Sequence, residues 1–228
     1  MIWQNIRAAI LRDLHTALSE DDAERSDQAM MPQHFEQSFG FGEGSWPAPV
    51  ILLEDGREVR LHGVIDRVDI NLERTRAQVI DYKTGRVEKD KPEAENLLLG
   101  GRKVQLAVYA EAVRRWAAET GEPIRDVESM YWFISAKGGF AKLSVPHTER
   151  VSAALAEVVN DIDQGVRTGA FPQAPGEFDD WWACWDNCRW CPFDRICPSG
   201  RDAAWERKRE DPASRLHSRL SLNAVDPG

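Results

Sequence analysis

Apolar residues recur at every fourth position near the start of the chain, from Ile2 to Leu18. This period places them on one face of an amphipathic helix, so a helix is predicted over residues 2–19. The acidic segment 19–26 that follows predicts a break after this helix. Three further helices are predicted over residues 103–119, 148–168 and 201–209.

Short runs rich in β-branched residues lie between the predicted helices and have the composition of strands. These runs are found at residues 50–53, 58–62, 63–70, 77–81, 129–134 and 140–145. Asp55-Gly56 is a turn signal between the first two runs, and the charged segment 71–76 joins the next two as a hairpin. We therefore predict that the strands from residue 50 to residue 81 form one continuous twisted meander. The order of elements predicts an α/β core with a mixed twisted sheet flanked by helices.

Two of these strands carry charged side chains within otherwise apolar runs. Asp81 and Lys83 are two positions apart and share one face of a strand, and the hairpin brings Asp66 alongside them. Two carboxylates and an ammonium at one point suit a phosphodiesterase that uses Mg²⁺ or Mn²⁺. The carboxylates would hold the cation, and the lysine would position the attacking water. The alternative interpretation is a surface hairpin that carries an ion pair.

The overall composition is that of an ordinary globular protein. Its 228 residues suit one sizeable domain, or one domain with an appended module, at 42% hydrophobic and 29% charged residues. No run of 18 apolar residues is present and the chain begins without a secretory signal, so we predict a cytoplasmic protein without a membrane partner. The net charge of −9 argues against passive nucleic-acid binding, although a nuclease site is itself acidic until a metal binds.

All four cysteines fall between residues 184 and 197. Such clustering in a cytosolic chain favours a metal centre over disulfides. The spacing is that of thiolate ligands, with Cys188-x2-Cys191 as the strongest pair, in the set Cys184, Cys188, Cys191 and Cys197. Zinc and a 4Fe-4S cluster both accept four thiolates, and the spacing does not separate them. We predict a core over residues 1–175 and a cysteine module over residues 176–228.

The charged strands and the residues downstream of them resemble a known family. Asp66, followed after fourteen residues by Asp81-Tyr82-Lys83, resembles the signature of the PD-(D/E)XK nucleases. Three longer motifs resemble those of the RecB-type branch of this family. They are Gly63-x2-Asp66-Arg67-x-Asp69, Asp81-Tyr82-Lys83-Thr84-Gly85 and Gln105-x3-Tyr109. The cysteines resemble the iron–sulfur staple found in AddB-type members of helicase–nuclease complexes and in CRISPR adaptation exonucleases.

The resemblance implies a restriction-endonuclease-like fold and a metal-dependent DNase. Such an enzyme would act on DNA ends or single strands in recombination, repair or defence, and could form part of a helicase–nuclease. Asp66, Asp81 and the carbonyl of Tyr82 would ligate Mg²⁺ or Mn²⁺. Gln105 and Tyr109 would surround the catalytic Lys83 or contact a DNA phosphate, and the four cysteines would hold the 4Fe-4S cluster.

The chain departs from the family pattern at two points. The family places one cluster cysteine far upstream, where this chain has none, so Cys184 either substitutes for it or the fourth ligand is missing. The family also places a metal-ligating histidine on a helix before the hairpin. His15 is the candidate here, with a surface or packed histidine as the alternative, and Glu36 is a second candidate beside the metal or substrate.

These departures keep two other functions open. One is a catalytically silent DNA-binding or scaffolding module, and the other is a zinc-ribbon binding protein. Basic residues near the gap between the second charged strand and the next helix are candidate phosphate contacts, with a solvated loop as the alternative. They are Arg86, Lys89, Lys91, Arg102 and Lys103.

Overall fold

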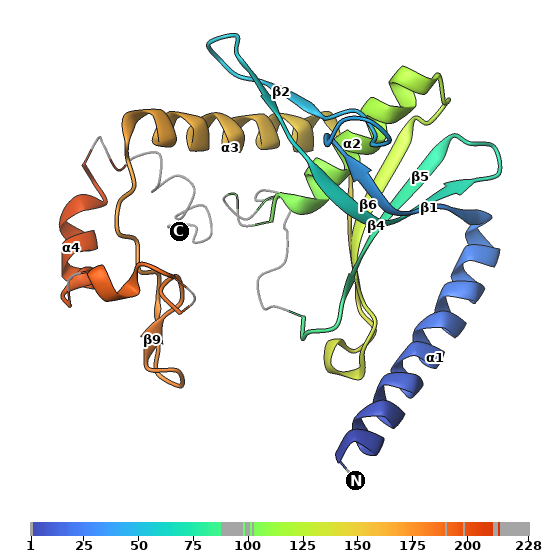
Figure 1. Cartoon of the computed structure of the whole chain (residues 1–228), viewed down its shortest axis with the longest axis horizontal. Helices are drawn as coiled ribbons and strands as arrows, with labels where there is room; N and C mark the ends of the chain where they lie inside the picture. The colour runs from blue at the N-terminus through green and yellow to red at the C-terminus, as the bar shows by residue number, and fades with distance from the viewer. Residues whose placement is uncertain are drawn as a thin grey trace. The chain divides into compact units, whose positions relative to one another are not determined.

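The structure is a computed structural model that describes residues 2–87, 98, 101, 103–189, 191–197, 199–211 and 214. It divides into two compact units, Met1–Glu157 and Val158–Gly228 (Figure 1). The helices are α1 (Ile2–Gln28), α2 (Gln105–Thr120), α3 (Glu149–Thr168) and α4 (Arg201–Lys208). The strands are β1 (Met30–Phe39), β2 (Val50–Leu52), β3 (Glu58–Arg60), β4 (Gly63–Asn71), β5 (Arg76–Lys83), β6 (Asp126–Phe133), β7 (Lys142–Pro146), β8 (Phe178–Asp179) and β9 (Cys184–Trp185).

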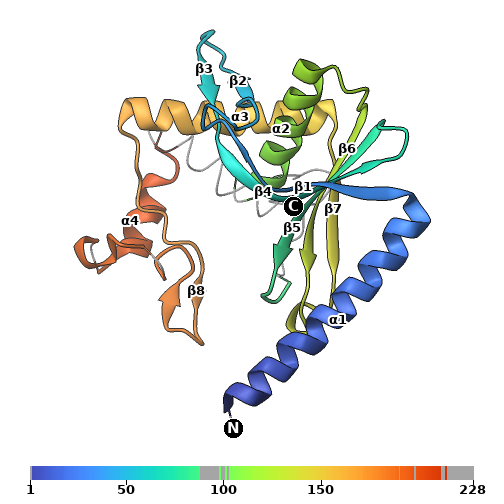
Figure 2. The ribbon, with the colours of Figure 1, turned by 45° about the vertical axis from the view of Figure 1, so that its right-hand side comes forward.

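The first unit is built on a five-stranded sheet in the order β1-β4-β5-β6-β7 (Figure 2). Strands β5 and β6 are parallel and are connected through α2, whereas the other neighbouring strands are antiparallel. A parallel pair requires such a crossover because a tight turn reverses the chain direction. The predicted α/β class, with a mixed sheet flanked by helices in a restriction-endonuclease-like core, is confirmed.

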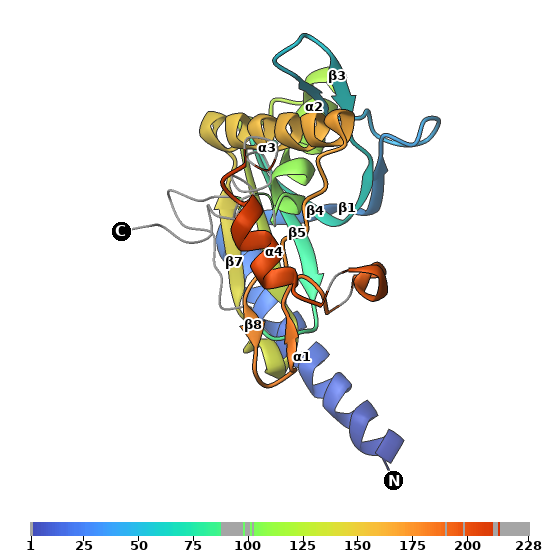
Figure 3. The same cartoon turned by 90° about the vertical axis from the view of Figure 1, so that its left-hand side faces the viewer.

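The predicted meander from residue 50 to residue 81 is correct in its second part and wrong in its first. Strands β4 and β5 pair antiparallel as predicted. Strands β2 and β3 form a separate two-stranded sheet, which projects at the top of Figure 3. The second neighbour of β4 is β1, which pairs with it antiparallel from Met30–Asn71 to Phe39–Gly63. The sequence does not reveal this pairing because β1 is an edge strand, half of its residues are polar, and an irregularity between Pro32 and His34 interrupts its alternation.

Gly63 at the start of β4 is required by a close approach of the neighbouring strand. The ring of Phe39, which is fully buried, lies directly over Gly63. A Cβ atom at position 63 would come within 2.8 Å of that ring. This glycine therefore allows β1 to close onto the strand that carries Asp66.

The two faces of the sheet are covered by different helices. Helix α2 packs through Ala112 and Val113 on the face that carries Val68 and Val79. Helix α1 contacts the other face, where Ala17 packs with Ile80, Met130 and Trp132. Because alternate residues of a strand point to opposite faces, each face has its own core.

Helix α1 differs from its prediction in length and in burial. It continues to Gln28, through the segment expected to be an acidic break. Those acidic residues are accommodated because Asp21 pairs with Arg67 and Glu24 with Lys142. The residues of its predicted apolar period are exposed, namely Ile2, Ile6, Ile10, Leu14 and Leu18. Trp3 and Leu11 are exposed as well.

Candidate active site

Asp66 and Asp81 lie close together at the ends of adjacent strands. The antiparallel register of β4 and β5 ends with Arg67 opposite Ile80, and Asp66 and Asp81 are the next residues on the two strands. Oδ2 of Asp66 accepts a hydrogen bond from the backbone N–H of Tyr82 at 2.8 Å, which holds Asp66 beside the end of β5. Asp81 is buried and Asp66 is half-buried. The two carboxylates that the sequence singled out are therefore brought together.

Lys83 joins these carboxylates on the same face. Its ammonium forms an ion pair with Oδ2 of Asp81 and donates a hydrogen bond to Oε1 of Gln105 at 3.4 Å. The amide of Gln105 donates in turn to the hydroxyl of Tyr109 at 2.8 Å. The four residues Asp81, Lys83, Gln105 and Tyr109 thus form one continuous polar chain between β5 and α2.

Tyr131 is a member of the site that the sequence did not indicate. It lies beside Asp81 in the register of β5 and β6, and the Lys83 ammonium is 5.0 Å from its ring centroid. The ammonium of Lys103 approaches the same ring at 5.8 Å. An aromatic face attracts a cation at such distances. Only the parallel pairing of β5 with β6 places this ring next to the lysine, and sequence spacing does not reveal that pairing.

Burial and neighbouring negative charges raise the pKa of two groups in the site, Asp81 and Tyr109. Burial raises the pKa of Asp81, Lys83 opposes this increase, and the nearby charge of Asp66 adds to it. Burial also raises the pKa of Tyr109, and the charges of Asp81, Asp66 and Glu36 add to that increase. A buried carboxylate next to a second carboxylate favours a bound cation, because the cation offsets both charges.

The backbone that carries Lys83 is held by the end of β6. The carbonyl of Lys83 accepts a hydrogen bond from the backbone N–H of Ile134 at 2.9 Å, and Ser135 donates to the carbonyl of Thr84 at 3.0 Å. Gly138 lies against Gly85, where an added Cβ atom would be 2.9 Å from the Gly85 carbonyl oxygen. The strand end that bears the site is therefore tightly enclosed by the β6–β7 connection.

The donor set fits a small divalent cation. Oδ2 of Asp81 is inaccessible to solvent and accepts no hydrogen bond of normal geometry within the described part of the chain, its contact being the Lys83 ammonium. Within that same part, no three His, Cys, Asp or Glu side chains form a metal-binding group. Mg²⁺ commonly takes one or two protein carboxylates and completes its coordination with water and substrate phosphates. Asp66 and Asp81 supply two carboxylates at this point.

The two further metal-ligand candidates occupy different places. Glu36 lies in β1 between Phe35 and Gln37, which pair with Arg67 and Ile65 of β4. Glu36 is exposed, and its backbone has a positive φ of 46°. Its charge reaches Tyr109, so it lies at the margin of the site. His15 is exposed on α1, the helix that packs through Ala17 on the opposite face of the sheet from α2.

The basic residues predicted near this site are only partly described. Lys103 lies beside Tyr131, and Arg86 is exposed just beyond the strand end. Lys89, Lys91 and Arg102 lie outside the described residues.

The cysteines belong to the second unit, where Cys184 is in the short strand β9. Cys188 and Cys191 follow in successive turns, with the N–H of Cys191 donating to the carbonyl of Cys188 at 3.1 Å. Cys197 follows the 3₁₀ turn Asp194–Ile196. All four thiols are free and half-buried.

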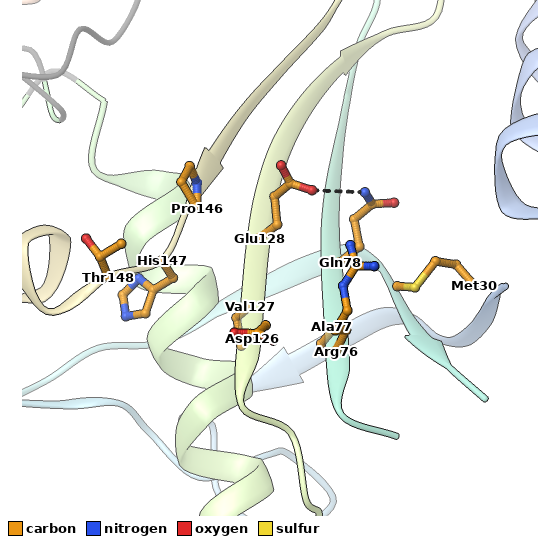
Figure 4. A pocket seen from close by; sticks show the side chains of 10 residues that line it. All are labelled: Met30, Arg76, Ala77, Gln78, Asp126, Val127, Glu128, Pro146, His147 and Thr148. Carbon is orange, nitrogen blue, oxygen red and sulfur yellow. Dashed lines mark hydrogen bonds between the residues drawn. The ribbon is translucent and has the colours of Figure 1, made fainter. Parts of the chain in front are cut away.

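A pocket of about 330 Å³ lies at the other end of the strands from the carboxylates. Its lining includes Arg76 and Gln78 at the start of β5, and Asp126 and Glu128 at the start of β6 (Figure 4). Asp81 and Lys83 are at the opposite end of β5. The pocket is therefore separate from the candidate active site.

The arrangement of two neighbouring carboxylates with a lysine two residues after the second is accompanied by a family match over residues 2–198, to the PD-(D/E)XK nuclease superfamily. The chain belongs to this superfamily. The predicted family is confirmed, and the match covers both the charged strands and the segment that contains the cysteines.

Two similar proteins are each named as one of the subunits of an ATP-dependent helicase/deoxyribonuclease. The one from Caldanaerobacter subterraneus subsp. tengcongensis is 37% identical over 94 residues, which is 40% of this chain and 8% of that protein. The one from Alkaliphilus oremlandii is 29% identical over 139 residues, which is 60% of this chain and 11% of that protein. This chain spans about a tenth of the length of these relatives.

The solved structure of SSO0001 is similar to this chain, with a TM-score of 0.38 and 14% sequence identity. The match covers 80% of this chain and 67% of the SSO0001 chain. No helix in the described part of the chain has the length and apolar character needed to cross a membrane.

Proposed function

We propose that this chain is a metal-dependent deoxyribonuclease that hydrolyses phosphodiester bonds. The observation that carries the proposal is that Asp66 and Asp81 lie at the adjoining ends of β4 and β5, with Lys83 paired to the second carboxylate. An ion pair that is only structural would need one carboxylate to neutralise Lys83. A second carboxylate leaves negative charge that Lys83 does not neutralise, and this charge can bind a divalent cation.

The candidate residues divide the chemistry among them. Asp66, Asp81 and the carbonyl of Tyr82 would hold Mg²⁺ or Mn²⁺, which supplies positive charge beside the scissile phosphate. Lys83 would orient the attacking water and stabilise the charge that develops at phosphorus. Gln105 holds the Lys83 ammonium in place through its hydrogen bond.

Replacement of Asp81 by Ala tests this function. Cleavage of labelled single- and double-stranded DNA in Mn²⁺ should fall on the order of a thousandfold, because loss of a metal ligand removes several kcal/mol of transition-state stabilisation. Asp126→Ala is the matched control, since Asp126 is an exposed strand aspartate at the far end of the sheet. Full activity of Asp81→Ala would show that this site is not catalytic. No cleavage by the wild-type chain would favour a silent DNA-binding module.

We further propose that the enzyme acts on DNA ends or single strands in concert with a helicase. The names of the relatives support this, because they combine a helicase with a deoxyribonuclease. Linear and circular single-stranded DNA distinguish the modes of cleavage. Degradation of the linear form alone is expected of an exonuclease, whereas cleavage of the circle would establish endonuclease activity.

We also propose that Cys184, Cys188, Cys191 and Cys197 bind a structural 4Fe-4S cluster. The support is their ligand-like spacing and the presence of four free thiols within one short segment. Hydrolysis of a phosphodiester moves no electrons, so the cluster would stabilise the fold rather than take part in redox chemistry. Protein purified without oxygen should be brown and contain four irons per chain, by the definition of the cluster. One tightly bound zinc in a colourless protein would replace the cluster in this proposal.

A further inference from the structure

A buried arginine lies on the face of the sheet opposite the candidate active site. Arg67 follows Asp66 directly, so its side chain projects from the other face of β4. Its guanidinium is 5% exposed and is bound bidentately by Asp69 of the same strand and by Asp21 of α1. The two bonds to Asp21 measure 3.0 and 3.1 Å. Bidentate pairing of this kind fixes the plane of the guanidinium as well as its position.

The network around Arg67 extends to a second arginine of α1. Arg25 donates to Asp21 at 3.0 Å and to the exposed Asp22 at 3.1 Å. Burial opposes the charge on Arg67, but its hydrogen bonds to Asp69 and Asp21 outweigh burial and raise its pKa. Removal of one member would leave a buried charge without its partner, which makes the set act as one unit.

Tyr82 connects this network to the opposite face. Its hydroxyl accepts a hydrogen bond from Nη1 of Arg67 at 3.0 Å. Its backbone N–H donates to Oδ2 of Asp66 at 2.8 Å. One residue is therefore held by the arginine through its side chain and by the candidate metal ligand through its backbone.

The position of Tyr82 matters because strands β4 and β5 cease to pair at this point. Their backbone register ends with Arg67 opposite Ile80. Beyond it, β5 still pairs with β6, in which Tyr82 is opposite Trp132. Towards β4, the hydrogen bonds of Tyr82 to Arg67 and Asp66 replace the backbone pairing that ends at Ile80. They set how far Asp66 stands from Asp81 at the end of the two strands.

We propose that helix α1 positions the candidate active site through Asp21, Arg67 and Tyr82. This inference rests on the proposed function, since the site is taken to bind Mg²⁺ or Mn²⁺. Asp21, Arg67 and the Tyr82 side chain are positioning residues, which act by holding the backbone next to the two carboxylates. Removing a group that orients a metal ligand without itself binding the metal typically weakens metal affinity by about 10–100-fold.

Tyr82→Phe is the sharpest test, because it removes one hydroxyl and keeps the ring that packs 5.7 Å from Trp132. Calorimetric titration with Mn²⁺, without DNA, should show an affinity about tenfold weaker than that of the wild-type chain. DNA cleavage should fall by a similar factor at low Mn²⁺ and recover in excess Mn²⁺. KM for DNA should stay unchanged, because the hydroxyl removed is bound to the buried Arg67.

Asp21→Asn extends the test to α1. It should weaken Mn²⁺ binding in the same direction, and combining it with Tyr82→Phe should weaken binding by less than the product of the two separate effects. Residues in one network behave in this non-additive way, whereas independent sites do not.

Glu122→Gln is the matched control. Glu122 forms a bidentate pair with Arg74, at 2.6 and 2.7 Å, at the other end of the β4–β5 hairpin. This variant should bind Mn²⁺ and cleave DNA like the wild-type chain. Equal Mn²⁺ affinity of Tyr82→Phe and wild type, in a chain that cleaves DNA, overturns this inference alone. A wild-type chain that binds no Mn²⁺ overturns the proposed function as well.

Discussion

At the scale of single residues, the burial of Asp81 in the candidate site affects the free energy of unfolding. Burial raises the pKa of Asp81, so the folded chain holds this proton more tightly than the unfolded chain. The stability that Asp81 contributes is therefore fully present below its unfolded pKa and is lost as pH rises through its folded pKa. Without a bound cation, Asp81 therefore contributes less stability at neutral pH than in acid.

Asp81→Asn should therefore stabilise the metal-free chain at neutral pH. Urea unfolding should give a higher free energy of unfolding than for the wild-type chain, and the difference should shrink as pH falls through the carboxylate range. Mn²⁺ should stabilise the wild-type chain more than this variant, because ligand binding to the folded state adds stability. Asp126→Asn, on the exposed start of β6, should show neither effect. A variant less stable than the wild type at neutral pH would contradict the argument.

Residues of the site were predictable where the signal is local and hidden where it depends on distant packing. Asp81 and Lys83 share a strand face by simple alternation, and Gln105 and Tyr109 share a helix face by their spacing of four. Tyr131 enters through the register of two parallel strands that are separated in sequence by a helix. Asp21 enters through the packing of α1 on the sheet, which no local pattern specifies.

At the scale of elements, the sequence identified helices and strands better than it identified their neighbours. The bounds predicted for α2 and α3 lie within two residues of the observed bounds. The β4–β5 hairpin was predicted correctly, but the second neighbour of β4 was not, because a strand run indicates an extended backbone and does not specify which strand it pairs with. The apolar period of α1 also resembled that of a buried face, although most of its apolar side chains are exposed.

Two identical substitutions distinguish these apolar positions. Ile70 is 1% exposed in β4 and Ile10 is 48% exposed in α1. Ile70→Ala should lower the free energy of unfolding by about 2–5 kcal/mol, because it leaves a cavity in the core. Ile10→Ala should change it by less than about 0.5 kcal/mol, as exposed substitutions usually do. Chemical denaturation of both variants measures the difference. A large loss for Ile10→Ala would indicate that its exposed face is covered in solution.

At the scale of the whole molecule, the two units differ in how they are stabilised. The first unit has a continuous apolar core on both faces of its sheet. Among the described residues of Val158–Gly228, the buried apolar side chains are those of Val158, Pro175 and Ala204. Trp181 in this unit is 85% exposed. So little burial cannot offset the entropy of ordering the chain, and the second unit needs another source of stability.

A metal centre held by the four cysteines would supply that stability. Structural zinc in small domains contributes on the order of 10 kcal/mol, and a thiolate cluster would act in the same way. The double variant Cys188→Ser with Cys191→Ser should therefore lose its metal and be cut by trypsin within the second unit, while a fragment containing the first unit persists. Ser199→Ala, an exposed change in the same segment, should leave the cleavage pattern unaltered. Equal resistance of the double variant and the wild-type chain, with no metal in either, would show that the second unit is stable without a staple.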